Sequence, residues 1–186
     1  FDKSRSMKEV FINKAAVFLP NESVSNSDME EYLGYVNGRP SRAKAIVLRR
    51  NGIKSRYYAL TKEGKSTHTN AEMCAAAIRN LFQEDTNQLK SIDLLCCGTS
   101  TPDQIIPSHA VMVHGNLPET NNIEVVSPAG ACCSGMHAFK YAYLSLKTGE
   151  KDKAVSTGSE RSAAMMTKGM FEEEVQVAEK IQEQPY

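Results

Sequence analysis

The amino-acid sequence predicts an α/β fold built from parallel βαβ units around a buried central helix. Residues 92–97 form a short, continuous apolar run, which is typical of a strand covered on both faces. Residues 134–147 have the apolar spacing of a long helix. Strand and helix patterns alternate at regular spacing through this part of the chain, and the alternation favours a parallel sheet.

The N-terminal part of the chain predicts a strand followed by a short helix. Val10–Leu19 is expected to be a strand. Asp28–Leu33 is expected to be a helix capped by Ser25 or Asn26, because these side chains can accept a hydrogen bond from a free backbone N–H. Residues 34–42 have the composition of a loop.

The next helix is predicted by its N-terminal signature. Thr69 and Glu72 have the spacing of a capping box. Behind them, residues at helical spacing indicate a helix that buries one face. These residues are Cys74, Ala75, Ile78, Leu81 and Phe82.

The remaining elements alternate between helix and strand. They are a helix near Ser108–His114, a strand at Ile123–Ser127, a helix at Ser134–Lys147 and a strand at Lys153–Gly158. The helix at 134–147 has one large apolar face and one face of small residues, so we expect it to be buried nearly all round. Lys168–Gln184 is charged and roughly amphipathic, and no element is assigned to it.

Composition excludes several classes of function. The 186 residues are 41% hydrophobic, enough for one sizeable core, and Lys+Arg and Asp+Glu both total 22. Nothing in this charge balance indicates a nucleic acid or an acidic membrane surface as a partner. No run approaches membrane-spanning length, and no signal-peptide pattern occurs. Five cysteines, in two adjacent pairs and one single residue, favour a reducing compartment, so we expect a cytoplasmic protein. Their spacing predicts no metal site.

The candidate site is the segment Gly130–Met136, which joins a predicted strand to a predicted helix. A cysteine at such a turn can be exposed, and the positive end of the helix dipole favours its thiolate. Small buried cysteines are the alternative. Cys132 and Cys133 are adjacent, so at most one is expected to face a site.

These residues resemble the active-site region of the β-ketoacyl-acyl carrier protein synthase III family, in the thiolase superfamily. Four other segments, in the same order along the chain, match the family between about Lys8 and Arg161. They are Ala15–Pro20, Val47–Ile53, Gly98–Pro102 and Thr157–Glu160. The resemblance implies a thiolase-like layered fold, of which residues 8–186 would be the N-terminal half-domain. Because family members are about twice as long, we expect the second half to lie outside this sequence, and residues 1–7 to be an expression remnant or a disordered start.

The resemblance identifies Cys133 as the nucleophile. It would accept an acyl group from a thioester, and a His–Asn pair from the second half would promote decarboxylation of a malonyl-thioester. The resulting carbanion would attack the acyl-cysteine in a Claisen-type condensation, in fatty-acid or polyketide-like biosynthesis. His137 lies four residues beyond Cys133, but a lone histidine more often packs or meets solvent. His68, His109 and His114 match no family motif.

Two further residues are predicted to bind substrate. The resemblance aligns Arg50 with an arginine that contacts the phosphates of coenzyme A or of the pantetheine arm, whereas a solvated basic turn is the alternative reading. It aligns Ile106 with a residue that crosses a dimer interface to the acyl pocket, whereas an ordinary core isoleucine is the alternative. Ile46 stands where the family has an adenine-stacking Trp, and the chain has no Trp, so adenine stacking is in doubt.

The expected partners are therefore acyl carrier protein or coenzyme A thioesters, in a homodimer, with no nucleic acid, membrane, metal or separate cofactor. Three other functions stay open. A hydroxymethylglutaryl-CoA synthase-like enzyme would use the same Cys133 without decarboxylation. A cysteine α/β-hydrolase would want Gly where Ala131 stands. A non-catalytic partner subunit of a condensing enzyme would keep only the fold. On its own, the sequence given is expected to be inactive in the full condensation.

Overall fold

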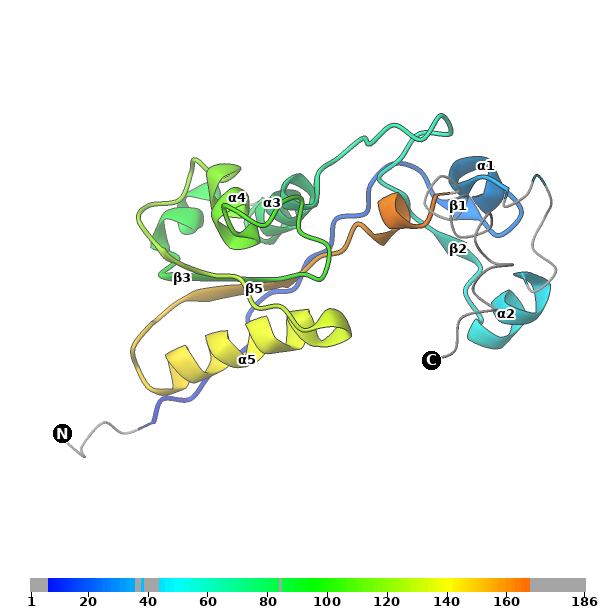
Figure 1. Ribbon diagram of the computed structural model, residues 1–186. Helices are drawn as coiled ribbons and strands as arrows, with labels where there is room; N and C mark the ends of the chain where they lie inside the picture. The colour runs from blue at the N-terminus through cyan, green and yellow to red at the C-terminus, as the bar shows by residue number, and fades with distance from the viewer. Residues whose placement is uncertain (1–6, 36–37, 39–43, 84, 168–186) are drawn as a thin grey trace, which may run out of the picture. The chain divides into compact units, whose positions relative to one another are not determined.

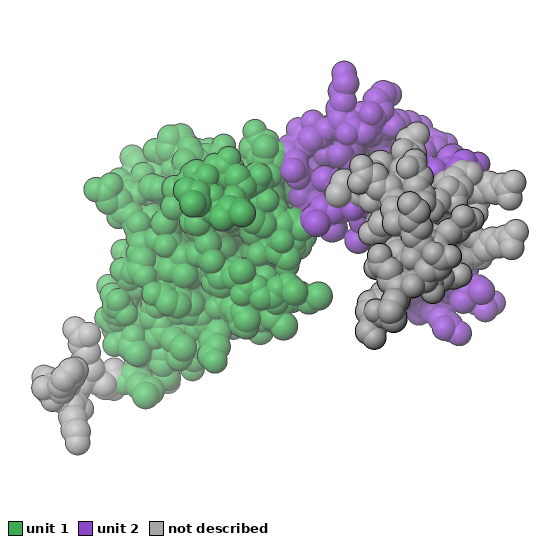
Figure 2. Space-filling view, viewed as in Figure 1, with its two compact units in different colours: residues 1–18, 69–160 green, residues 19–68, 161–186 purple. Residues whose placement is uncertain are grey.

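The computed structural model describes residues 7–35, 38, 44–83 and 85–167. The chain divides into two compact units, coloured separately in Figure 2. Unit 1 comprises residues 1–18 and 69–160, and unit 2 comprises residues 19–68 and 161–186. Most of residues 1–7, most of the predicted loop at 34–42 and all of Lys168–Gln184 lie outside the described residues.

Unit 1 contains a parallel sheet with the strand order β4–β3–β5. The central strand β3 (Leu94–Gly98) pairs with β4 (Glu124–Val126) and with β5 (Ala154–Gly158). Every residue of β3 is buried, because both faces of the sheet are covered. The predictions of a parallel sheet and of a doubly covered strand are thus confirmed.

Helices cover the two faces of this sheet (Figure 1). On one face lie α3 (Asn70–Leu81) and α4 (His109–Gly115), and on the other lies α5 (Ser134–Lys147). The alternation of side chains along β3 divides the core between these faces. Leu95 and Cys97 pack among α3 and α4, whereas Leu94 and Cys96 pack against α5. The short 3-10 helix η2 (Thr86–Ser91) leads into β3.

The predicted capping box begins α3. The Thr69 hydroxyl accepts a hydrogen bond from the Glu72 N–H at 3.1 Å, and the Glu72 carboxylate accepts one from the Thr69 N–H at 2.8 Å. The carboxylate of Asp103 accepts from the next two backbone N–H groups, those of Asn70 and Ala71. Three of the orphan donors of this helix end are therefore satisfied within unit 1.

The expectation that α5 is buried nearly all round is wrong. Only its small face packs on the sheet, where Ala138 is 0% and Ala142 5% exposed. Small side chains let the helix backbone approach the strands closely, so the large residues point elsewhere. Met136 is 66% exposed and Phe139 42%.

The predicted strand at Val10–Leu19 is also wrong: the structure has no strand there. A strand needs a neighbour to satisfy its backbone groups, and in the described part of the chain no strand pairs with this segment. Its apolar side chains are correspondingly exposed, with Phe11 at 71% and Val17 at 65%.

Unit 2 is a small assembly around Val24, Tyr58, Leu60 and Ala163. Its elements are β1 (Val24–Ser25) antiparallel to β2 (Ser55–Arg56), α1 (Met29–Leu33), α2 (Lys44–Asn51) and the 3-10 helix η4 (Ser162–Met165).

The predicted helix at 28–33 is confirmed as α1, although its cap differs. Asp28 occupies the cap position, and Ser25 accepts a hydrogen bond from the Asp28 N–H instead of capping the helix itself. The helix α2 was not anticipated, because it buries none of its residues and so leaves no apolar period in the sequence.

Candidate active site

The two cysteines of the candidate site lie at the turn between β4 and α5. The 3-10 helix η3 (Ala131–Cys133) leads directly into Ser134, the first residue of α5. Cys133 therefore stands at the cap position of a 14-residue helix, as predicted. Both Cys132 and Cys133 are free and exposed, so both thiols are open to a reagent and exposure alone does not distinguish them.

The carboxyl ends of β3 and β5 support this turn through glycines. A Cβ atom on Gly98 would collide with the carbonyl group of Ser134, and a Cβ on Gly135 would lie 3.3 Å from Gly158 Cα. The first turn of α5 is therefore packed directly on strand backbone. This contact fixes where Cys133 stands relative to the sheet.

Two hydroxyl groups hold the residue at the centre of the turn. Ala131 has a φ of +49°, a left-handed conformation that costs a non-glycine residue about 1 kcal/mol or more. Its carbonyl oxygen accepts hydrogen bonds from the Ser100 hydroxyl at 2.7 Å and from the Ser134 hydroxyl at 2.8 Å. These bonds help to retain the strained conformation two residues before Cys133.

Ser100 is held in turn by Glu160, which follows β5. One carboxylate oxygen of Glu160 accepts from the Ser100 N–H at 2.7 Å, and the other accepts from the Thr101 hydroxyl at 2.7 Å. Both segments resemble the family in sequence, and the resemblance alone implies no role for either. The structure brings them together beside the cysteine turn.

None of the four histidines is placed as an obvious base for Cys133. His137 is exposed, and its Nδ1 lies 3.3 Å from the carbonyl oxygen of Ala129, with its ring against Gly130. His68 lies in unit 2 and is paired locally with Thr67, and His114 contacts the carbonyl of Asn121. The positions of His137 and His114 agree with the expectation that they pack or meet solvent, and so does that of His109, which is 2% exposed.

The two other predicted site residues, Ile106 and Arg50, belong to segments of the chain other than the cysteine turn. Ile106 is in a loop of unit 1 and is 84% exposed, so within the described residues it is no core isoleucine. Arg50 is exposed in the last turn of α2, in unit 2. Their substrate contacts stay predictions.

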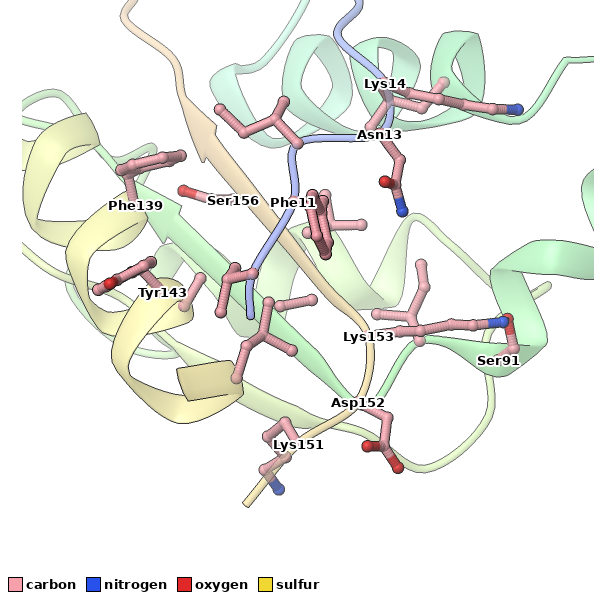
Figure 3. A pocket seen from close by; sticks show the side chains of 18 of the residues that line it. Phe11, Asn13, Lys14, Ser91, Phe139, Tyr143, Lys151, Asp152, Lys153 and Ser156 are labelled. Atoms are coloured by element: carbon pink, nitrogen blue, oxygen red, sulfur yellow. The ribbon is translucent and has the colours of Figure 1, made fainter. Parts of the chain in front are cut away.

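A pocket of about 640 Å³ lies elsewhere in unit 1, between residues 8–14, α5 and β5 (Figure 3). The rings of Phe11, Phe139 and Tyr143 line it together with Lys151. No residue of the Gly130–Met136 segment is among its lining residues. The pocket is therefore a feature of the exposed apolar side of α5 and not of the thiol site.

The described residues contain no group of three or more His, Cys, Asp or Glu side chains that could hold a metal ion. They also contain no helix that is long and apolar enough to cross a membrane.

The relatives found by sequence comparison carry the same description. The chain is 27% identical, over 154 residues, to a β-ketoacyl-[acyl-carrier-protein] synthase III of Neisseria gonorrhoeae. The match covers 83% of this chain and 44% of that protein, so the chain spans less than half the length of the curated relatives it matches. No model of a known protein family matches the chain.

Comparison with solved structures gives the same fold. A β-ketoacyl-[acyl carrier protein] synthase III of Thermus thermophilus aligns with 82% of this chain and 43% of its own, at a TM-score of 0.65 and 20% identity. A tetronic acid condensing enzyme, AbyA1, aligns with 90% of this chain and 49% of its own, at a TM-score of 0.65 and 21% identity. At this level of identity the structures show the fold alone, and that fold is thiolase-like, as predicted.

Proposed function

The chain is a homologue of the β-ketoacyl-[acyl-carrier-protein] synthases III, and from that premise we propose that it carries the nucleophile of an acyl-transferring condensing enzyme. The observation that supports this most directly is Cys133, exposed at the start of α5 on a turn held by hydroxyl groups and strand ends. A thiol in this place is open to a thioester and lies at the positive end of the helix dipole.

The first step is acyl transfer. The Cys133 thiolate attacks the thioester carbonyl, a Cys133–acyl bond forms, and the carbon–sulfur bond to the carrier breaks as its thiol leaves with a proton. Backbone N–H groups at the turn would stabilise the oxyanion. The N–H of the acylated residue donates to the Gly130 carbonyl at 3.0 Å in this structure, so it would have to leave that partner to take part.

The second step is condensation. A malonyl-thioester loses carbon dioxide, and its carbanion attacks the acyl-Cys133 carbonyl. A carbon–carbon bond forms, the carbon–sulfur bond to Cys133 breaks, the cysteine thiolate is regenerated, and a β-ketoacyl-thioester leaves the enzyme. The His and Asn that would assist decarboxylation are expected outside this sequence. In the complete enzyme, Arg50 would bind the phosphates of the carrier arm, and Ile106 would reach the acyl pocket of a homodimer, in the cytoplasm. Acyl carrier protein or coenzyme A would deliver the substrates.

Acyl labelling tests the first step. The protein is incubated with acyl-CoA thioesters of increasing chain length, and intact mass spectrometry follows the products. We expect one acyl adduct, mapped by fragmentation to Cys133. A chain that takes up no acyl group, or takes it up on lysines alone, would contradict the proposal and favour a non-catalytic partner subunit.

A second assay separates the condensing reaction from a hydroxymethylglutaryl-CoA synthase-like one. Acylated protein with its complete reading frame is offered malonyl-acyl carrier protein or acetoacetyl-CoA. Release of carbon dioxide with the malonyl substrate is expected. Consumption of acetoacetyl-CoA without carbon dioxide would support the alternative.

Ser100→Ala should slow acylation of Cys133 by about fivefold, because the Ala131 carbonyl loses one of its two hydrogen bonds from hydroxyl groups, each typically worth about 1 kcal/mol. The matched control is Ser91→Ala, which removes an exposed hydroxyl with a similar bond to the Gln88 carbonyl, away from the turn. Acylation and iodoacetamide alkylation rates are measured for both variants. Equal rates in the two variants would show that Ser100 does not position the turn.

A further inference from the structure

A cluster of thiol and polar side chains lies in the core of unit 1, on the face of the sheet that α3 and α4 cover. Cys74 of α3 and Cys97 of β3 are its sulfur groups, and they are 1% and 0% exposed. Their Sγ atoms are 4.0 Å apart. Nothing in the proposed acyl transfer uses these residues, which face away from α5.

Polar groups surround the thiol of Cys74. Its Sγ lies 3.1 Å from the Thr157 hydroxyl of β5. His109 of α4 is 2% exposed, and its Nε2 lies 3.1 Å from the Ser159 hydroxyl. The other ring nitrogen of His109, Nδ1, is buried without a hydrogen-bond partner in the described residues. Such an orphaned nitrogen in a core is costly, and the same imidazole is one of the groups that lower the pKa of Cys74.

The two thiols are unequal. The neighbouring thiol of Cys97 lowers the pKa of Cys74 most, and His109 and Thr157 lower it further, against the opposing effect of burial. The pKa of Cys97 is raised, first by its bond to Cys74 and then by burial. These opposite directions favour Cys74 over Cys97 as the thiolate of the pair. A nucleophilic thiolate next to a second thiol is the arrangement that peroxides convert to a disulfide.

We propose that Cys74 and Cys97 form an oxidative modification site, at which a hydroperoxide converts the two thiols to an intrachain disulfide, with His109 as a positioning residue. The Cys74 thiolate attacks one peroxide oxygen, the O–O bond breaks, and the sulfenic acid of Cys74 forms. The released alkoxide or hydroxide takes up a proton. Cys97 then attacks the sulfenic sulfur, the S–S bond forms, and water leaves with the Cys97 proton. The two thiols are oxidised by two electrons, and the peroxide is reduced to an alcohol, or to water from hydrogen peroxide.

The geometry allows this bond with a modest movement. The sulfur atoms must approach from 4.0 Å to roughly 2.0 Å. Helix α3 packs on this face of the sheet through small side chains such as Ala71 and Ala75, so the approach needs a shift of the helix or a rotation of the two cysteine side chains. Burial also makes the site selective: a reagent as small as hydrogen peroxide enters more easily than an alkylating agent, which meets the exposed Cys132 and Cys133 first.

The experiment uses the difference in access between the buried thiols and the exposed ones. The folded chain is first alkylated with N-ethylmaleimide, which blocks Cys132 and Cys133, and is then treated with hydrogen peroxide. We expect the intact mass to fall by two hydrogen atoms and peptide mapping to find Cys74 joined to Cys97. A product that gains oxygen atoms without a cross-link, or no change while the folded protein persists, would overturn the proposal. The readout does not involve acylation, so the result tests the disulfide proposal independently of the proposed function.

The neighbouring cysteine provides a matched control. Cys96 is equally buried, but it packs on the α5 side of β3, and burial raises its pKa to about 11. Cys96→Ser should still form the cross-link, whereas Cys97→Ser should lose it. Loss in both variants, or a cross-link through Cys96, would contradict the assignment. Should the serine variants fail to fold, peptide mapping of the wild-type chain decides the question alone.

His109→Gln separates positioning from a structural role. This variant keeps a polar side chain but lacks an imidazole, so we expect disulfide formation to slow by about tenfold, more at pH 6 than at pH 8, because the imidazole no longer lowers the pKa of the Cys74 thiol. An unchanged pH profile would show that His109 does not act on the dithiol.

Discussion

Cys133→Ala should abolish acylation of the chain, whereas Cys132→Ala should keep most of it. The first variant removes the proposed nucleophile at the cap position of α5, and no other group at the turn replaces it. The second removes a thiol from the preceding residue, inside η3, and is expected to react within about threefold of the wild-type rate. Acyl transfer is measured by intact mass after incubation with acyl-CoA.

The two variants form a strict comparison because both side chains are exposed. Surface substitutions of this kind usually change the free energy of unfolding by less than about 0.5 kcal/mol, so a loss of labelling would report chemistry and not unfolding. Equal loss in both variants would break the assignment of Cys133. Loss in Cys132→Ala alone would transfer the role to Cys132.

The sheet and its helices could be predicted because each has a local signal. The apolar run of β3, the capping box of α3 and the period of α5 each fix an element within a few residues, and Ser134–Lys147 has the predicted bounds. The segment at 10–19 has the composition of a strand but finds no paired neighbour in the described residues. Its error shows that a strand depends on a partner as well as on its own residues.

The sequence pattern overestimates the burial of α5 for a related reason. Its sequence contains both a small and a large apolar face, and the pattern alone does not say how many neighbours cover them. The structure covers the small face, through Ala138 and Ala142, and exposes Met136.

The cysteine turn could be found from the sequence, but its supports could not. Cys133 sits between a strand pattern and a helix pattern, which is a local feature. Ser100 and Glu160 reach the turn from segments more than 25 residues away, and their role depends on hydrogen bonds to backbone. The buried dithiol is equally invisible, because Cys74 and Cys97 come together only when α3 packs on β3.

Gly98→Ala should destabilise unit 1 by about 3 kcal/mol or more, because a methyl group would be forced against backbone that cannot retreat. The new Cβ would collide with the carbonyl group of Ser134 and lie 2.8 Å from the Gly135 nitrogen. The helix end cannot move away freely, because Gly135 also packs against Gly158. The strand cannot move either, since β3 is paired on both sides. We therefore expect a lower urea midpoint and slower alkylation of Cys133.

Gly115→Ala is the matched control for this prediction. Gly115 ends α4, and a Cβ there would meet nothing within 4 Å. Alanine is the better helix former, so this variant should be neutral or more stable by up to about 1 kcal/mol. If Gly98→Ala unfolded at the same urea concentration as Gly115→Ala, the close contact between β3 and α5 would be wrong, and with it the account of how the sheet positions Cys133. If only Gly98→Ala is destabilised, the carboxyl ends of the parallel strands hold the first turn of α5 and its cysteine in place.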